Sequence, residues 1–182
     1  MIDYSLTTAQ KQVVTDRTVF YLENANRALG LNLGLIPILF DLKGKASGMF
    51  VVGRDKKIIR YNEIIFSKYF EDAVISTTAH EVAHYVNYEL HGAKRVKPHG
   101  QEWRSLMQLF DVKPEVTSRY DLAGLPLRQQ KQHLYQCDCM QHSLSTTRHN
   151  RIQASKVSYN CRRCLKPLKL KPPIHISRSG CD

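Results

Sequence analysis

The motif His80-Glu81-Val82-Ala83-His84 constrains the fold of this chain more than any other feature. Side chains four residues apart on an α-helix project from the same face, so a helix here brings His80 and His84 together. Two neutral imidazoles so placed can hold one zinc ion at about 2.0–2.1 Å each. Glu81 lies at the edge of that face, where its carboxylate can accept a proton from a water molecule. The motif therefore predicts a helical zinc site with a general base beside it.

The residues around the motif favour a helix. Residues 71–90 include no Gly or Pro, and Gly92 follows at a position typical of a helix end. Apolar residues recur at spacings of three and four, which predicts one buried stripe formed by Ile75, Ala79, Val82, Val86 and Leu90. The two histidines project away from the centre of this stripe. We therefore expect the helix to pack against a core and to turn its histidines toward a cleft.

A catalytic zinc needs a third protein ligand and an open fourth position. The candidates near the motif are Glu89, His91, His99 and Glu102. His99 is placed best, because it follows a polar loop and opens a segment with apolar residues at helical spacing, which are Trp103, Leu106, Met107 and Phe110. We expect Trp103 to anchor this second helix against the first and so to fix His99.

Four cysteines near the C-terminus form two close pairs, Cys137 with Cys139 and Cys161 with Cys164. Two such pairs can close a tetrahedral thiolate site for a second, structural zinc, at about 2.3 Å per bond. The tight spacing of the first pair leaves open that His142 or His149 replaces one of its cysteines. A module of this size has too little core to fold alone, so its zinc would contribute folding free energy directly. Cys181 is left over and is expected to be a free thiol without a role.

Positive charge is concentrated in the C-terminal third of the chain. The net charge is +11, and residues 128–182 hold 11 Lys and Arg against two Asp, whereas residues 1–127 are nearly neutral. A basic module beside a nearly neutral domain predicts a polyanionic partner, most simply DNA, although a solvated basic tail would look the same. The candidate phosphate contacts are Arg148, Arg151, Lys156, Arg162 and Arg163. Tyr135 and Tyr159 either stack on exposed bases or pack the small sheet.

The rest of the chain predicts an α+β fold. The expected elements are a helix from Thr7 or Thr8 to about Ala28, strands over 35–42, 48–52 and 57–61, and a short helix over 62–70. The motif helix and the Trp103 helix follow, and 114–132 forms a connector. Strand-forming residues also precede Cys161, over 157–159.

The sequence lacks the signals of an exported or membrane protein. Residues 1–14 have no apolar segment of the kind found in signal peptides, and the apolar stretch 31–42 is too short to span a bilayer. Cysteines in such a chain are not expected to form a disulfide framework. We therefore expect a cytoplasmic monomer without a membrane partner.

The motif, followed by His99-Gly100-Gln101-Glu102-Trp103, resembles the SprT-like (Spartan-type) zinc metallopeptidase family, with its HExxH and HGxxW elements. The cysteine-containing run 135–164 resembles the zinc ribbon of the bacterial members, and the resemblance covers roughly residues 6–170. It implies a zincin-like (minigluzincin-type) catalytic domain with a small antiparallel sheet, one catalytic zinc and one structural zinc. The best-understood eukaryotic members of the family cleave proteins crosslinked to DNA.

We therefore predict a zincin-like domain over 1–127, a basic zinc ribbon over 128–171 and a tail over 172–182. The predicted activity is zinc-dependent hydrolysis of peptide bonds in protein substrates, including DNA-bound or DNA-crosslinked proteins, with Glu81 as catalytic base. Additional oxyanion donors could come from Tyr85, Tyr88 or Tyr120. Two alternatives remain: a zinc-stabilised nucleic-acid-binding protein whose catalytic centre is vestigial or regulatory, and an unrelated zinc hydrolase of small substrates.

Overall fold

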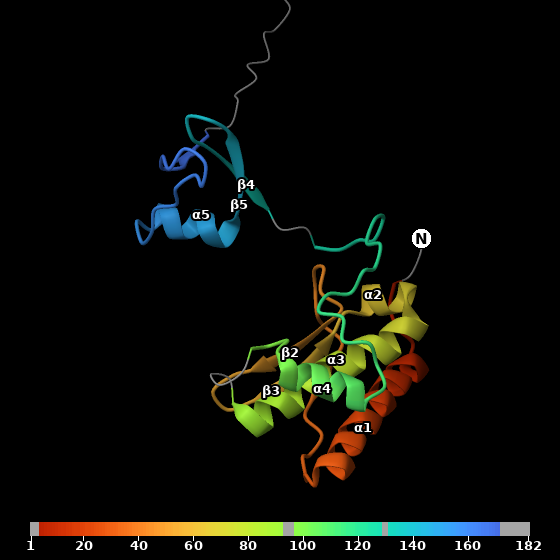
Figure 1. Ribbon diagram of the computed structural model, residues 1–182. Coiled ribbons are helices and arrows are strands. Elements are labelled where there is room, and N and C mark those ends of the chain that lie inside the picture. The colour runs from red at the N-terminus through yellow and green to blue at the C-terminus, as the bar shows by residue number, and fades with distance from the viewer. Residues whose placement is uncertain (1–3, 93–96, 129–130, 172–182) are drawn as a thin grey trace, which may run out of the picture. The chain divides into compact units, whose positions relative to one another are not determined.

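The computed structural model describes residues 4–92, 97–128 and 131–171 (Figure 1). The chain forms two compact units, Met1–Arg128 and Gln129–Asp182, called here the N-terminal and the C-terminal unit. The predicted tail 172–182, with Cys181, lies outside the described residues. Among those described, no helix is both long and apolar enough to cross a membrane.

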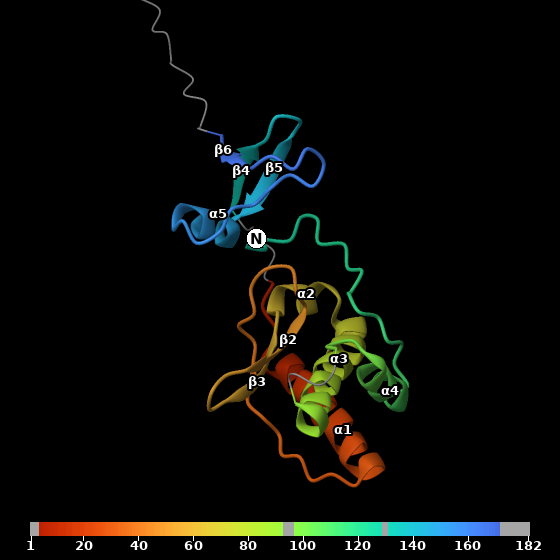
Figure 2. The same ribbon diagram turned by 60° about the vertical axis from the view of Figure 1, so that its left-hand side comes forward.

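The N-terminal unit contains four helices and three strands among its described residues. In chain order they are α1 (Thr8–Leu29), β1 (Ile38–Leu39), β2 (Gly48–Val52), β3 (Lys57–Tyr61), α2 (Glu63–Lys68), α3 (Phe70–His91) and α4 (Gln101–Leu109). Helix α3 is central, because α1, α4 and β2 all pack against it (Figure 2). The largest fully buried side chains of this unit come from β3, α2 and α4, and include Ile59, Tyr61, Ile65, Phe66, Trp103 and Met107.

Helix α1 begins and ends with capping signals that are visible in the sequence. The Thr7 hydroxyl accepts a hydrogen bond from the Gln10 amide at 3.2 Å, and the Gln10 side chain accepts one from the Thr7 amide at 3.0 Å. This reciprocal pair is a capping box, which satisfies two amides that the first turn leaves free. Gly30 ends the helix with a φ of 63°, a left-handed conformation that glycine adopts without strain.

The sheet of the N-terminal unit is mixed, and not antiparallel as predicted. Its strand order is β1-β3-β2, with β2 antiparallel and β1 parallel to the central strand, so that Ile38 lies opposite Ile59. The strand expected over 35–42 is reduced to Ile38–Leu39. Pro37 has no amide hydrogen and contributes only its carbonyl oxygen, which accepts a bond from Ile59 at 3.0 Å, so the ladder cannot extend through it.

The predicted apolar stripe of α3 is buried only in its middle. Ala79, Val82 and Val86 are in the core, whereas Ile75 and Leu90 are 46% and 42% exposed. Neighbouring elements cover the central turns of α3 on several sides, but the stripe lacks this cover at both of its ends. Ile75 instead lines a cavity beside the histidines.

The C-terminal unit is a small sheet with one helix. Strands β4 (Gln132–Gln136) and β5 (Gln141–Ser145) form a hairpin, α5 (Thr146–Gln153) follows, and β6 (Lys169–Leu170) pairs with the other edge of β4. Tyr135, Leu144 and Cys161 form its small buried centre.

The strand expected over 157–159 is absent from this unit, and α5 lies where the sequence showed only a basic segment. The residues after 157–159 form a single bridge, between Asn160 and Pro167. Because Pro167 has no amide hydrogen, it cannot extend that bridge into a ladder. The helix was missed because its short sequence has little apolar periodicity to mark it.

Candidate metal centres and catalytic site

Three histidines of the N-terminal unit converge on one point. His80 and His84 come from adjacent turns of α3, and His99 lies two residues before α4. Their Nε2 atoms are 3.1 Å apart in every pair. A tetrahedral ion with bonds of about 2.0–2.1 Å separates its nitrogen ligands by roughly 3.3–3.4 Å. The three rings therefore fit around one small metal ion and leave a fourth direction for water or substrate.

Trp103 holds this group together, as its place in the sequence predicts. Its side chain is fully buried, and its ring centroid lies 4.8 Å from that of His80 and 4.7 Å from that of His99. Its Nε1–H donates to the His80 carbonyl oxygen at 3.4 Å. The Trp103 ring thus contacts His80, which lies on α3, and His99, which lies just before α4.

The structure brings His99, rather than the other third-ligand candidates, to the histidine pair. Within the described residues, the potential metal-binding group at this position contains His80, His84 and His99 alone. Glu89 is engaged elsewhere, in an ion pair with Lys57 at 2.5 Å. His91 and Glu102 are not members of the group.

The surroundings keep all three imidazoles neutral at neutral pH. Burial, with a smaller contribution from His99, lowers the pKa of His80 to about 4. Burial and the two neighbouring rings lower the pKa of His84 to about 3, and burial also lowers the pKa of His99. Neutral imidazoles have the free lone pair that metal binding requires.

Glu81 is buried between α3 and the edge strand β2. Its side chain is 5% exposed, and its Oε2 accepts a hydrogen bond from the Phe50 amide at 2.6 Å. Burial raises the pKa of Glu81 to about 8, and the Phe50 amide opposes this shift. The Phe50 hydrogen bond and the surrounding packing hold the carboxyl group in one position, which a general base requires.

Gly48 makes this packing possible. A Cβ atom at Gly48 would lie 2.7 Å from Glu81 Cγ, Glu81 Oε1 and Thr77 Cγ2. The glycine is therefore required for space. Sequence reasoning did not identify Gly48 or Phe50 as part of the site. A glycine inside a predicted strand was the only available signal, since it often marks close approach of another group.

A cavity of about 650 Å³ opens beside His80 and Glu81. Of the three tyrosines considered as oxyanion donors, only Tyr120 lines it. The Tyr120 hydroxyl donates to Asp72 Oδ2 at 2.5 Å and lies 3.1 Å from Ser76 Oγ. Burial and the bond to Asp72 raise the Tyr120 pKa to about 12. Residues of the segment 111–122 thus form one wall of the site. From the sequence, Tyr120 was the one member of this segment considered for the site.

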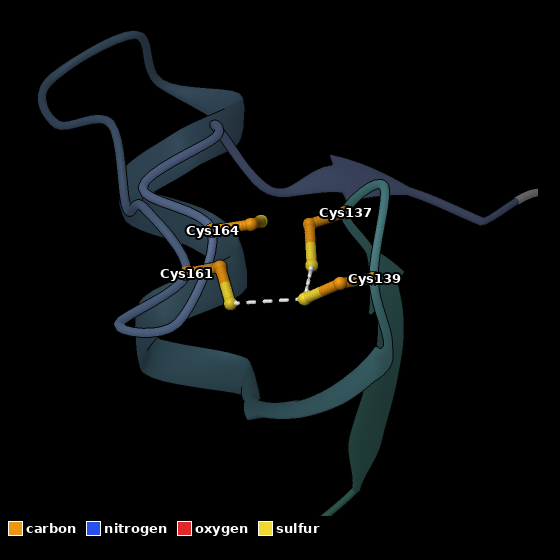
Figure 3. A group of neighbouring side chains, drawn as sticks. All are labelled: Cys137, Cys139, Cys161 and Cys164. Atoms are coloured by element: carbon orange, nitrogen blue, oxygen red, sulfur yellow. Dashed lines mark hydrogen bonds between the residues drawn. The ribbon is translucent and has the colours of Figure 1, made fainter.

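The four cysteines of the C-terminal unit also converge (Figure 3). Cys139 Sγ lies 3.5 Å from Cys137 Sγ and 3.7 Å from Cys161 Sγ, and the Sγ atoms of all four, Cys164 included, lie within 4.8 Å of one another. Tetrahedral zinc–thiolate bonds of about 2.3 Å separate the sulfur atoms by roughly 3.8 Å. The group therefore fits one metal ion held by four sulfurs.

The two histidines considered as substitute ligands occupy other positions. His142 Nε2 lies 3.2 Å from Cys137 Sγ, within hydrogen-bonding distance of one sulfur of the group. His149 stacks on His133, with ring centroids 3.8 Å apart, and its Nδ1 lies 3.0 Å from the Tyr135 hydroxyl. Four sulfurs complete the group without either ring, and Tyr135 serves to pack the sheet.

The basic residues predicted to contact DNA are all exposed. Arg148 and Arg151 lie on α5 and Lys156 follows it, while Arg162 and Arg163 lie between the paired cysteines 161 and 164. Arg151 and Lys156 line one shallow groove, and the Arg148 guanidinium lies over the Tyr159 ring at 5.8 Å. Among the described residues of this unit, no basic side chain forms an ion pair with a carboxylate.

Comparison with known proteins places this chain in a family. A model described as the SprT-like family matches residues 23–121. Protein SprT of Vibrio parahaemolyticus is 32% identical over 168 residues, which cover 92% of this chain and 95% of that protein. Protein SprT of Pasteurella multocida is 34% identical over 133 residues, covering 72% and 76% respectively. No solved structure matches significantly. The chain belongs to the SprT-like family.

Proposed function

We propose that this protein is a zinc-dependent metallopeptidase that hydrolyses peptide bonds in protein substrates. The observation that carries the proposal is the buried Glu81 carboxyl group beside three converging imidazoles, at the side of a cavity. Zinc held by His80, His84 and His99 would polarise the scissile carbonyl and acidify a water molecule. The HExxH helix, the edge strand beside it and the family membership together support a zincin-like fold for the N-terminal unit.

Glu81 carries the proton in this proposal. The Phe50 amide binds Oε2, which leaves Oε1 to accept a proton from the attacking water and to deliver it to the leaving amine. Burial of a carboxyl group is unfavourable unless the group is compensated. A site that served only to stabilise the fold would need the histidines but not Glu81, so the carboxyl group favours catalysis over a vestigial centre.

The edge strand β2 supports a polypeptide substrate. The Ser47 carbonyl oxygen accepts a hydrogen bond from the Asn62 amide, and the Gly53 amide donates one to the Lys56 carbonyl oxygen. The backbone groups of residues 47 and 53 therefore point toward the β3 side. The alternation of an antiparallel ladder then directs the backbone groups of residues 48, 50 and 52 away from β3. The Phe50 amide on that side reaches Glu81. An extended substrate segment could pair with this edge and lie beside the base.

The C-terminal unit supports DNA as a partner. Residues 131–171 hold nine Lys and Arg and a single acidic residue, Asp138. We propose that the four cysteines hold a structural zinc and that Arg148, Arg151, Lys156, Arg162 and Arg163 contact phosphates. A peptidase with such an anchor would act best on proteins bound or crosslinked to DNA, because binding raises the local substrate concentration.

The proposal is tested by removal and return of the metal. Protein treated with a chelator should not cleave a fluorescently labelled unfolded casein, and one equivalent of zinc at the histidine site should restore cleavage. A DNA-binding protein offered with and without DNA tests the anchor in the same assay. Cleavage that persists in fully metal-free protein would contradict the proposed chemistry.

A further inference from the structure

The cavity beside the catalytic residues exposes apolar side chains to solvent. Ile75, on the turn of α3 before His80, is 46% exposed, and Val116 is 43% exposed. Both line the cavity together with His80 and Glu81. Large apolar side chains that are left half exposed inside a cavity often mark a binding surface.

The outer wall of the cavity is fixed before any substrate arrives. The Tyr120 ring stacks on Tyr69, with centroids 4.6 Å apart, and its hydroxyl bonds to Asp72. The next carbonyl, that of Asp121, accepts bonds from Lys68 Nζ at 3.0 Å and from the Tyr69 hydroxyl at 2.5 Å. These contacts hold the segment 112–122 against the N-terminal half of α3, so the cavity is largely preformed.

The lining favours an apolar occupant over a charged one. Its apolar side chains include Ile75, Met107, Val112, Val116 and Leu122. Of the charged residues in the lining, Lys113 pairs with Glu115 at 2.8 Å and Asp72 accepts the Tyr120 hydroxyl. Lys45, Asp111 and Arg119 also line the cavity. A charged substrate side chain placed against Ile75 and Val116 would lose water to an apolar surface, whereas an apolar side chain would gain from its burial there.

We propose that this cavity binds a large apolar side chain of the polypeptide substrate, next to the scissile bond. The inference rests on the proposed peptidase function and adds the side-chain class that the enzyme selects. An apolar side chain that fills such a pocket raises kcat/KM by roughly 10- to 100-fold over a charged one of similar size.

Peptides that differ at one position test the proposal directly. The cleavage sites in unfolded casein are first mapped by mass spectrometry, and a ten-residue peptide around one site is made with Leu, Phe or Glu in each flanking position. The wild-type protein should prefer Leu or Phe at one flanking position by roughly 10-fold or more. Ile75→Lys should remove this preference and favour the Glu peptide.

Leu90→Lys is the matched control. Leu90 lies on the same helix and is 42% exposed, against 46% for Ile75, but it does not line the cavity. This variant should keep the wild-type preference. Equal behaviour of the two Lys variants, or a wild-type protein that ignores the flanking side chain, would overturn the proposal.

Binding separates a failure of this inference from a failure of the peptidase proposal. Fluorescein-labelled Leu and Glu peptides can be titrated into the Glu81→Gln protein, which is not expected to cleave them. Tighter binding of the Leu peptide, lost in Glu81→Gln/Ile75→Lys, would support the cavity even if the wild-type protein cleaved nothing. Equal binding of both peptides would contradict the cavity assignment even if the wild-type protein were an active peptidase.

Discussion

Replacing Gly48 with Ala should misplace the Glu81 carboxyl group, the proposed catalytic base, without touching the histidines. The new Cβ would lie 2.7 Å from Glu81 Cγ, Glu81 Oε1 and Thr77 Cγ2. Carbon atoms in contact are normally about 3.5–4.0 Å apart, so the strand and the Glu81 side chain must separate by roughly 0.8 Å or more. Neither α3 nor β2 can absorb this freely, because the Phe50 amide bonds to Glu81 at 2.6 Å two residues along the strand.

The expected effect is larger on catalysis than on stability. Inserting a methyl group into a packed region costs about 1–3 kcal/mol of unfolding free energy, which the domain should tolerate at 25 °C. Displacing a catalytic group by about 1 Å can lower the rate by roughly 100-fold. We therefore expect kcat for peptide cleavage to fall by about 10- to 100-fold in Gly48→Ala, while zinc at the histidine site remains bound.

The assay compares Gly48→Ala with Gly53→Ala, which lies just past the other end of β2. A Cβ at Gly53 would meet the flexible side chain of Lys56, at 3.3 Å from its Cγ, and would lie far from the base. Peptide cleavage, thermal midpoint and zinc content by elemental analysis are measured on both. The argument that Glu81 needs the space left by Gly48 would be refuted by a wild-type kcat in Gly48→Ala. It would also be refuted by an equal loss of kcat in both variants.

Three further predictions concern the two metal groups and the basic surface. His99→Ala should reduce zinc from two to one per chain by elemental analysis and should abolish cleavage. His91→Ala should change neither the zinc content nor cleavage. The reverse pattern would identify His91 as the third ligand. Cys161→Ser with Cys164→Ser should remove the other zinc and unfold the C-terminal unit, seen as loss of its NMR amide dispersion, while the histidine site keeps its metal. Arg148→Ala with Arg151→Ala should flatten the log–log salt dependence of DNA affinity by about one to two units, whereas Lys43→Ala with Lys56→Ala in the N-terminal unit should leave the slope unchanged.

The features that follow from short-range spacing were predictable from the sequence. The four-residue interval between His80 and His84 fixes their common helical face. Trp103 follows His99 by four residues, so the first turn of α4 can pack beside the histidine that precedes it. The predicted ranges 48–52 and 57–61 are confirmed as strands, since a hairpin is specified by local alternation and a turn.

The features that depend on contacts between distant segments were not predictable. The parallel pairing of β1 requires Ile38 to lie opposite Ile59, with strand β2 between them in the sequence, and no local pattern encodes this. Ile75 faces a cavity whose opposite wall includes Tyr120, a residue 45 positions later in the sequence. The role of Gly48 depends on the Glu81 side chain of α3. These are tertiary relations, which a helical or strand periodicity does not contain.

The central claim, that Glu81 acts as a base beside a metal held by three histidines, is tested most directly by Glu81→Gln. The amide keeps the size and can still accept the Phe50 hydrogen bond, but it cannot take up the proton of the attacking water. Cleavage of a labelled unfolded protein and zinc content are measured on the same sample. We predict full zinc occupancy with a loss of activity of roughly 100-fold or more. Zinc-loaded Glu81→Gln protein that cleaves at the wild-type rate would contradict the account.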